Sequence, residues 1–379
     1  MKSASLLLRF VKLALGVAAL ALLGACSSGP AKPKPAELAP NAGLLGVRLA
    51  WTAKVAAVDF ALDVKVSGNN VTLASADGVV VSLDGRTGAE LWRASVGERV
   101  AAGVGSDGKV AALLTRGNEL IALDAGQELW RQRLPAQSFT APLVAGGRIF
   151  VLGADRAVSA FDARSGTRLW TQQRPGEPLV LRQAGVLLAV GDTLVAGLSG
   201  RLVGLNPGNG SVRWEAPIAS PRGTNDIERL VDLVGRVSRD GSVVCARAFQ
   251  TAVGCVDAAR GTLLWSKPAI GWVGVHGDDR TLFGVESDGK VLAWRRGNGE
   301  QLWASEALRY RVLTAPLLIG RSVAVGDDTG LVHWLSREDG SALARMPTDG
   351  SALASAPVLA GGTLVVVTRN GGVFGFKPE

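Results

Sequence analysis

The chain has 379 residues, of which 47% are hydrophobic and 20% are charged, with 49 Gly and 16 Pro. This composition excludes a disordered or collagen-like chain and is typical of a globular protein with a large core. The formal net charge is +8, and the basic residues are spread along the sequence rather than gathered in one run. Because the chain lacks a basic stripe, we expect no nucleic acid among its partners.

Residues 1–25 have the features of a bacterial lipoprotein signal peptide. A short region with three basic residues precedes the apolar stretch LALGVAALALL, which is short for a membrane span. The stretch ends in Leu-Gly-Ala-Cys, which resembles a lipobox, so Cys26 is the predicted lipidation site and first mature residue. Ser27 follows, where lipoproteins kept in the inner membrane usually carry Asp, and this favours the outer membrane. An ordinary secretory signal with an incidental Cys is the alternative.

Residues 26–46 are a predicted tether between the lipid and a folded domain. The stretch contains Pro at positions 30, 33, 35 and 40 and shows no apolar periodicity. A partly polyproline-like chain of this length has a reach of about 50–60 Å.

A ten-residue phrase recurs through the rest of the chain and ends in Leu-Trp or a near variant. Copies include LDGRTGAELW at 83–92, FDARSGTRLW at 161–170 and VDAARGTLLW at 256–265. A spacing of about 42 residues between phrase ends matches the length of a four-stranded propeller blade. The phrase ends at eight positions. Ala344 takes the place of the Trp at one of them, and the other seven are Trp51, Trp92, Trp130, Trp170, Trp214, Trp265 and Trp303.

Between the phrases, short apolar runs separated by Gly, Asp and Asn are typical of β-hairpins. In each phrase an Asp or Asn can close an Asx-type turn, and a Gly can adopt positive φ. An indole on each blade can fill the gap to its neighbour, so we expect the Trp residues to pack blades rather than to stack ligands. One inner turn recurs eight times, at residues 77–78, 117–118, 155–156, 200–201, 250–251, 288–289, 329–330 and 371–372.

The two ends of the chain predict how the ring closes. Trp51 ends a copy of the phrase that has no blade before it. The last unit, in contrast, supplies three strands but no copy of the phrase after them. The sequence therefore predicts an all-β protein: a single eight-bladed β-propeller of four-stranded antiparallel blades over residues 47–379, closed by its N-terminal strand. Closure leaves no long free edge.

No catalytic or metal-binding motif stands out. His276 and His333 lie in different units without metal-ligand spacing, and we interpret both as core or turn residues. Residues 103–108 match GxGxxG, but a dinucleotide site must open a helix, whereas this stretch leads into a strand. We therefore predict no metal, no cofactor and no enzymatic activity.

Cys245 and Cys255 flank one inner hairpin turn in a chain predicted to be exported. An odd-length turn places them opposite each other, and an oxidising compartment favours a disulfide. A pair of small buried thiols is the alternative.

The repeated phrase resembles the tryptophan docking motif of propellers built from quinoprotein-type repeats, a fold that two families share. Pyrroloquinoline quinone dehydrogenases are much longer and carry a vicinal Cys-Cys pair and a calcium site, which this chain lacks. The BamB family of outer-membrane assembly lipoproteins suits the lipobox, the tether and the single ring. This resemblance covers essentially the whole chain.

Two stretches between blades carry the more specific likeness to the BamB family. EPLVLRQAG at 177–185 resembles a family segment with two leucines and an arginine, which correspond to Leu179, Leu181 and Arg182. In NDIERLVDLVGR at 225–236, Asp232 matches one family aspartate, whereas Val234 replaces a second. The resemblance implies that these loops bind the periplasmic domains of BamA, with Asp232 facing a basic partner or orienting Arg182. The alternative interpretation is that these loops differ in length without a binding role and that the leucines are buried between blades.

The resemblance implies a lipid-anchored scaffold on the periplasmic face of the outer membrane. In the family this scaffold assists the folding and insertion of β-barrel proteins, with unfolded outer-membrane proteins as further candidate partners. A small quinone-dependent dehydrogenase and a lipid-anchored propeller that binds cell-wall glycan are the two alternatives.

Overall fold

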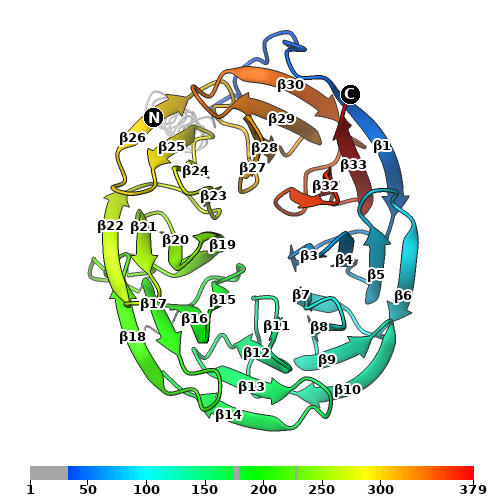
Figure 1. Ribbon diagram of the computed structural model, residues 1–379, viewed down its shortest axis with the longest axis vertical. Coiled ribbons are helices and arrows are strands. Elements are labelled where there is room, and N and C mark those ends of the chain that lie inside the picture. Colours follow the sequence, from blue (N-terminus) through cyan, green and yellow to red (C-terminus); the bar gives the residue numbers. More distant parts are fainter. Residues whose placement is uncertain (1–32, 175–178, 227–228) are drawn as a thin grey trace, which may run out of the picture. The chain divides into compact units, whose positions relative to one another are not determined.

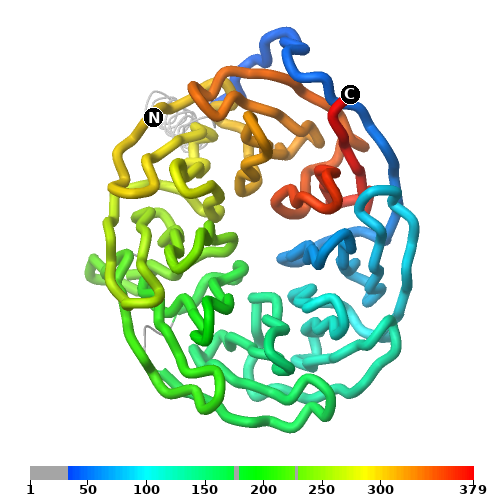
Figure 2. Tube along the Cα trace, viewed as in Figure 1, coloured from blue at the N-terminus to red at the C-terminus, as the bar shows by residue number. Residues whose placement is uncertain are grey.

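The computed structural model describes residues 33–174, 179–226 and 229–379. Residues 36–379 form one compact unit, in which eight β-sheets follow one another as the blades of a ring (Figure 1). Figure 2 shows the chain passing once round this ring from its blue to its red end. Within the described ranges, no helix is long and apolar enough to cross a membrane.

Blades 1 to 4 are four-stranded antiparallel meanders of consecutive strands. A short extra strand, β2 (Ala61–Leu62), pairs in parallel with β7 at the inner edge of blade 2. The strands of the four blades are β3 (Lys65–Ser67), β4 (Asn70–Ala74), β5 (Val79–Asp84) and β6 (Glu90–Ser95); β7 (Val100–Ser106), β8 (Val110–Thr115), β9 (Glu119–Asp124) and β10 (Gln127–Arg133); β11 (Leu143–Ala145), β12 (Arg148–Leu152), β13 (Val158–Asp162) and β14 (Arg168–Gln172); and β15 (Leu187–Val190), β16 (Thr193–Leu198), β17 (Arg201–Leu205) and β18 (Val212–Pro217).

Blades 5 to 7 repeat this pattern, and blade 8 combines the last three strands of the chain with β1 (Val47–Lys54). β1 pairs antiparallel with β33, which confirms the predicted closure by the N-terminal strand. The remaining strands are β19 (Leu233–Asp240), β20 (Val243–Ala248), β21 (Ala252–Asp257) and β22 (Thr262–Pro268); β23 (His276–Gly277), β24 (Thr281–Val285), β25 (Val291–Arg295) and β26 (Gln301–Ser305); β27 (Leu317–Ile319), β28 (Ser322–Gly326), β29 (Leu331–Ser336) and β30 (Ala342–Pro347); and β31 (Val358–Ala360), β32 (Thr363–Val367) and β33 (Gly372–Pro378).

The hydrophobic core lies between neighbouring blades. All six residues of β8 are buried because this middle strand is covered on both faces, whereas the outer strand β6 alternates between exposed and half-buried positions over most of its length. Phe150 of blade 3, for example, packs in one cluster with Leu194 of blade 4. The hydrophobic clusters of the described residues lie within 38–379.

Each phrase-ending Trp docks on the phrase of the next blade. Trp51 in β1 donates a hydrogen bond from Nε1 to the Gly85 carbonyl over 3.1 Å, and its ring lies against Gly88 of blade 1. Gly88 has a φ of +74°, and a Cβ there would lie 2.5 Å from the indole. The predicted role of the Trp residues in blade packing is therefore confirmed. The other pairs of this kind are Trp92–Gly126, Trp130–Gly166, Trp170–Gly210, Trp214–Gly261, Trp265–Gly299 and Trp303–Gly340.

We expect Gly299→Ala to destabilise the ring. Gly299 has a φ of +72°, and a Cβ would lie 2.5 Å from the ring of Trp265. Backbone strain and the clash together should lower the free energy of unfolding by roughly 2–4 kcal/mol, measured by urea unfolding. Gly297→Ala is the matched control, since a Cβ at this position in the same turn meets no atom within 4 Å. Equal losses in the two variants would contradict the docking role.

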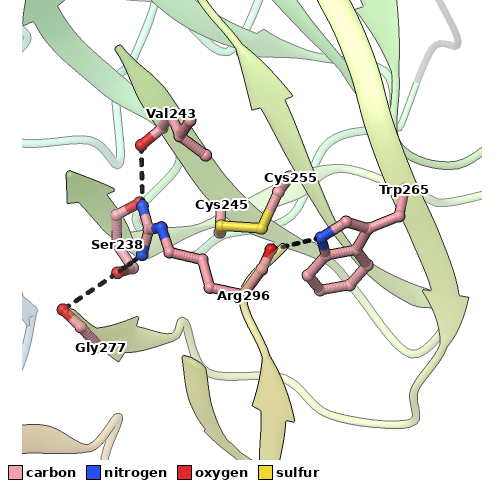
Figure 3. The surroundings of a disulfide bond; sticks show 7 residues. All are labelled: Ser238, Val243, Cys245, Cys255, Trp265, Gly277 and Arg296. Carbon is pink, nitrogen blue, oxygen red and sulfur yellow. Dashed lines mark hydrogen bonds between the residues drawn. A yellow bond between two sulfur atoms is a disulfide. The ribbon is translucent and has the colours of Figure 1, made fainter. Parts of the chain in front are cut away.

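A disulfide joins the two cysteines of blade 5. Cys245 in β20 faces Cys255 in β21, with their Cα atoms 4.0 Å apart, and both residues are fully buried. Figure 3 shows Arg296 of blade 6 beside this bond, donating a hydrogen bond to Ser238 of blade 5. The Nε1 of Trp265 donates in turn to the Arg296 carbonyl over 2.7 Å. The disulfide thus lies inside the packed junction of two blades.

Residues 36–46, which the sequence assigns to the tether, lie along the outer strand of blade 7; we call them the N-terminal strap (Figure 1). The Ala36 N–H donates to the Arg309 carbonyl over 2.9 Å, and Leu45 packs in one cluster with the buried Ala344. The strap therefore packs against the small side chain at the one phrase end that is not a Trp.

Candidate partner-binding site

The predicted binding segment 179–182 lies in the connection from β14 of blade 3 to β15 of blade 4. Leu179 is 42% exposed and Arg182 is also exposed, whereas Leu181 is half-buried. The first residues of the resemblance, 177 and 178, lie outside the described residues. The structure therefore presents one exposed apolar side chain and one exposed cation at this surface.

Arg182 rests on an aromatic ring from the preceding blade connection. Its guanidinium carbon lies 5.5 Å from the centroid of Phe139, a geometry that favours a cation–π interaction. Arg182 forms no ion pair with any carboxylate in the part of the chain that the structure describes. Its charge is thus oriented by the ring and is available to an acidic or carbonyl-rich partner.

A buried ion pair holds the binding segment in place. Arg156, which is 6% exposed, donates from Nη1 to the Asp232 carboxylate over 3.1 Å and from Nη2 to the Leu179 carbonyl over 2.8 Å. The second carboxylate oxygen of Asp232 accepts the Leu181 N–H over 3.0 Å. We call Arg156 and Asp232 the clasp, because together they fix the backbone on both sides of Val180.

The clasp corrects one expectation. Asp232 does not orient Arg182, because its carboxylate is already paired with Arg156 and with the backbone of Leu181. The sequence identified Arg156 only as a turn residue, and indeed it has a positive φ of 64°. Nothing in the sequence pattern indicates that its side chain is buried and reaches two other blade connections.

The long loop before blade 5 contributes less charge than the resemblance suggests. Val234, at the position of the second family aspartate, is the second residue of β19 and is 1% exposed. A carboxylate there would be removed from water, so the apolar side chain fits its surroundings. Asp226 is exposed in the same loop, and residues 227–228 lie outside the described residues.

The two histidines are structural residues of the ring. His333 is buried, and its Nε2 lies 2.9 Å from Asp327 Oδ2. Although burial acts to raise the pKa of Asp327, the hydrogen bonds from His333 and from the Leu331 N–H lower this pKa to about 2. Burial, aided by two neighbouring arginines, lowers the pKa of His276 to about 3, so its imidazole is neutral at pH 7. Both match the prediction of core or turn positions.

The remaining sequence candidates fall on ordinary elements. Gly103 lies in β7 and Gly108 in the hairpin before β8, so the GxGxxG match is a turn, as predicted. In the described residues no group of three or more His, Cys, Asp or Glu is arranged to hold a metal ion. Cys26, the predicted lipidation site, lies outside the described residues.

Comparisons with known proteins agree on one family. The family model described as outer membrane protein assembly factor BamB matches residues 76–305, more than half of the chain. The chain is 38% identical to BamB of Burkholderia pseudomallei, over 99% of this chain and 100% of the relative. It is also 38% identical to BamB of Bordetella pertussis, over 94% of this chain and 93% of the relative.

Solved structures support the same assignment. The crystal structure of BamB from Moraxella catarrhalis matches with a TM-score of 0.79 and 25% identity, over 87% of this chain and 99% of that chain. The quinohemoprotein alcohol dehydrogenase of Comamonas testosteroni matches with a TM-score of 0.67 at 15% identity, over 89% of this chain and 78% of that chain, and shares the fold alone. The chain belongs to the BamB family of outer membrane protein assembly factors.

Proposed function

We propose that the chain is a non-enzymatic, lipid-anchored scaffold of the machinery that inserts β-barrel proteins into the outer membrane. It binds the periplasmic domains of BamA through the surface formed by Leu179 and Arg182. Relatives over nearly the whole length are named outer membrane protein assembly factors, which supports this role. The cysteines lie at positions 26, 245 and 255, so the vicinal Cys-Cys pair of quinone dehydrogenases has no counterpart.

The observation that carries the proposal is an exposed Leu179 followed three residues later by an exposed Arg182, which forms no ion pair in the described residues, on a backbone held by the clasp. Interfaces obtain most of their affinity from a few residues, among which Arg is enriched, and a fixed segment loses little entropy on binding. The clasp holds this segment from both sides through the Leu179 carbonyl and the Leu181 N–H.

We expect Cys26→Ala to release the protein from membranes. Acyl chains contribute about 0.8 kcal/mol per buried CH₂, so a chain without them should be recovered as an unprocessed or mislocalised form. Fractionation of cell envelopes measures this, with Ser28→Ala as the control that should remain anchored. Normal processing and retention of the Cys26→Ala protein would contradict lipidation.

The N-terminal strap limits how far the ring can lie from its anchor. The strap begins at Ala36, so only the nine residues 27–35 separate it from Cys26. Such a segment spans at most about 35 Å when fully extended, less than the reach predicted for a tether that continues to residue 46. The scaffold therefore works close to the membrane surface.

Affinity purification of the full-length protein from native membranes tests the proposed function. We expect BamA and other assembly subunits to co-purify with the parent protein. Recovery of peptidoglycan fragments without BamA would support the glycan-binding alternative. A quinone absorption band in the purified protein would support the dehydrogenase alternative.

A further inference from the structure

The ring surrounds a central cavity that the proposed function uses only at one residue of its lining, Arg182. The cavity has a volume of about 1050 Å³ and is lined by inner strands and blade connections from around the ring. Small-molecule sites typically occupy about 300–1,000 Å³ and combine apolar walls with a few polar groups. The cavity is therefore large enough to hold a ligand.

Its wall has apolar side chains that remain accessible. Val312 is 48% exposed and Leu359 is 42% exposed, and the half-buried Trp272 adds an aromatic face to the same lining. These side chains are not packed by the ring itself. Covering them with an apolar body would remove their surface from water, at about 25 cal/mol for each Å².

The same lining contains more cations than carboxylates. Lys65, Arg182, Arg236 and Arg369 all border the cavity, and none of them forms an ion pair within the described ranges. The lining contains three carboxylates. One of them, Asp59, already forms ion pairs of 2.5 and 2.8 Å with Arg99 and Arg116, which lie outside the lining. Asp328 and Asp63, which interacts electrostatically with Lys65 and Arg236, remain against four cations, so the lining keeps a net positive charge and favours an anion.

Two side chains cross the cavity and limit what fits. Arg236 in blade 5 donates from Nη1 to the carbonyl of Pro357, next to the inner strand of blade 8, over 2.6 Å. Gln183 in the connection to blade 4 donates to the carbonyl of Trp272, in the connection to blade 6. These bridges do not leave a clear passage for a polypeptide strand. They favour a compact molecule that lies on one side of them.

We propose that the central cavity binds a small amphipathic anion: a carboxylate or phosphate group carried on a compact apolar body. The anionic group lies near the cations of the lining, and the apolar body covers Val312, Leu359 and Trp272. The proposal shares Arg182 with the partner-binding surface but does not rest on Leu179 or the clasp, so its tests leave Arg182 unchanged.

Titration with anilinonaphthalene sulfonate, a fluorescent aromatic anion, tests this site on the soluble chain that begins at Ser27. We expect one saturable site from which octanoate and octyl phosphate both displace the probe. Octanol and inorganic phosphate at equal concentrations should displace much less, since each lacks one half of the ligand. The stronger of the two octyl competitors identifies the preferred anionic group.

Two substitutions of the exposed Val312 test whether the probe binds in the cavity or on another apolar surface. Val312→Glu should weaken probe binding by about tenfold, whereas Val312→Lys should preserve or strengthen it, because only the sign of the added charge differs. Arg236→Met should also weaken binding, and Arg168→Met on the outer strand β14 should not. Equal affinities for the Glu and Lys variants, or the absence of saturable binding, would overturn the proposal.

Discussion

Deletion of residues 47–55 should open the ring and produce a chain that unfolds at a much lower temperature. The deleted stretch contains β1, whose pairing with β33 extends from Val47 opposite Pro378 to Lys54 opposite Gly372. It also removes Trp51, whose indole joins blade 8 to blade 1. Loss of a large buried aromatic side chain alone costs about 3–5 kcal/mol. The freed edge of β33 adds unpaired backbone groups that favour aggregation.

Calorimetry and size-exclusion chromatography measure this outcome. The loss of Trp51 alone lowers Tm by roughly 4–7 °C in a ring of this length, and the loss of the β1 ladder adds to this shift; we expect soluble aggregates as well. Deletion of residues 28–33 is the control, because it shortens the chain before the ring and leaves β1 intact. A 47–55 deletion with the Tm and the elution volume of the parent would mean that the ring closes in another way.

Asp232→Ala should be among the most destabilising single substitutions in the ring. The change leaves the Arg156 guanidinium buried without its carboxylate, and breaking a buried ion pair in this way costs about 3–5 kcal/mol. The Arg156 and Asp232 side chains are only 7% and 16% exposed, so water compensates little. The Leu181 N–H loses its acceptor at the same time.

Urea unfolding of a small set of variants isolates this effect. Asp226→Ala, an exposed residue of the same loop, should change stability by less than about 0.5 kcal/mol. The double variant Arg156→Met/Asp232→Ala should be more stable than Asp232→Ala, because it removes the unpaired charge as well. If Asp232→Ala behaves like Asp226→Ala, the clasp does not stabilise the connection.

The ring could be predicted from the sequence because one physical contact is repeated along it. An indole from one blade meets a positive-φ Gly in the next, so Trp51 and Gly88 mark the same junction as Trp265 and Gly299. The repeat fixes the blade length, the number of blades and the incomplete unit at each end. Alternating burial in the outer strands then follows from the stacking of the blades.

The features without periodicity could not be predicted. The N-terminal strap is rich in Pro and lacks a strand pattern, yet it contacts blade 7 through backbone groups that sequence does not distinguish. β2 has only two residues and pairs with β7 through the backbone alone. The clasp joins positions 76 residues apart, and Arg156 is outwardly an ordinary turn residue. Such long-range polar contacts have no local signature.

Direct binding of the ring to the purified periplasmic domains of BamA is the decisive measurement. We expect Leu179→Ala/Arg182→Ala to weaken this binding at least about tenfold while Tm stays within a few degrees of the parent, since both side chains are exposed. Arg168→Ala/Leu169→Ala removes an equally exposed Arg and Leu from β14 and should leave the affinity unchanged. Equal affinities for the parent and for Leu179→Ala/Arg182→Ala would contradict the proposed binding surface.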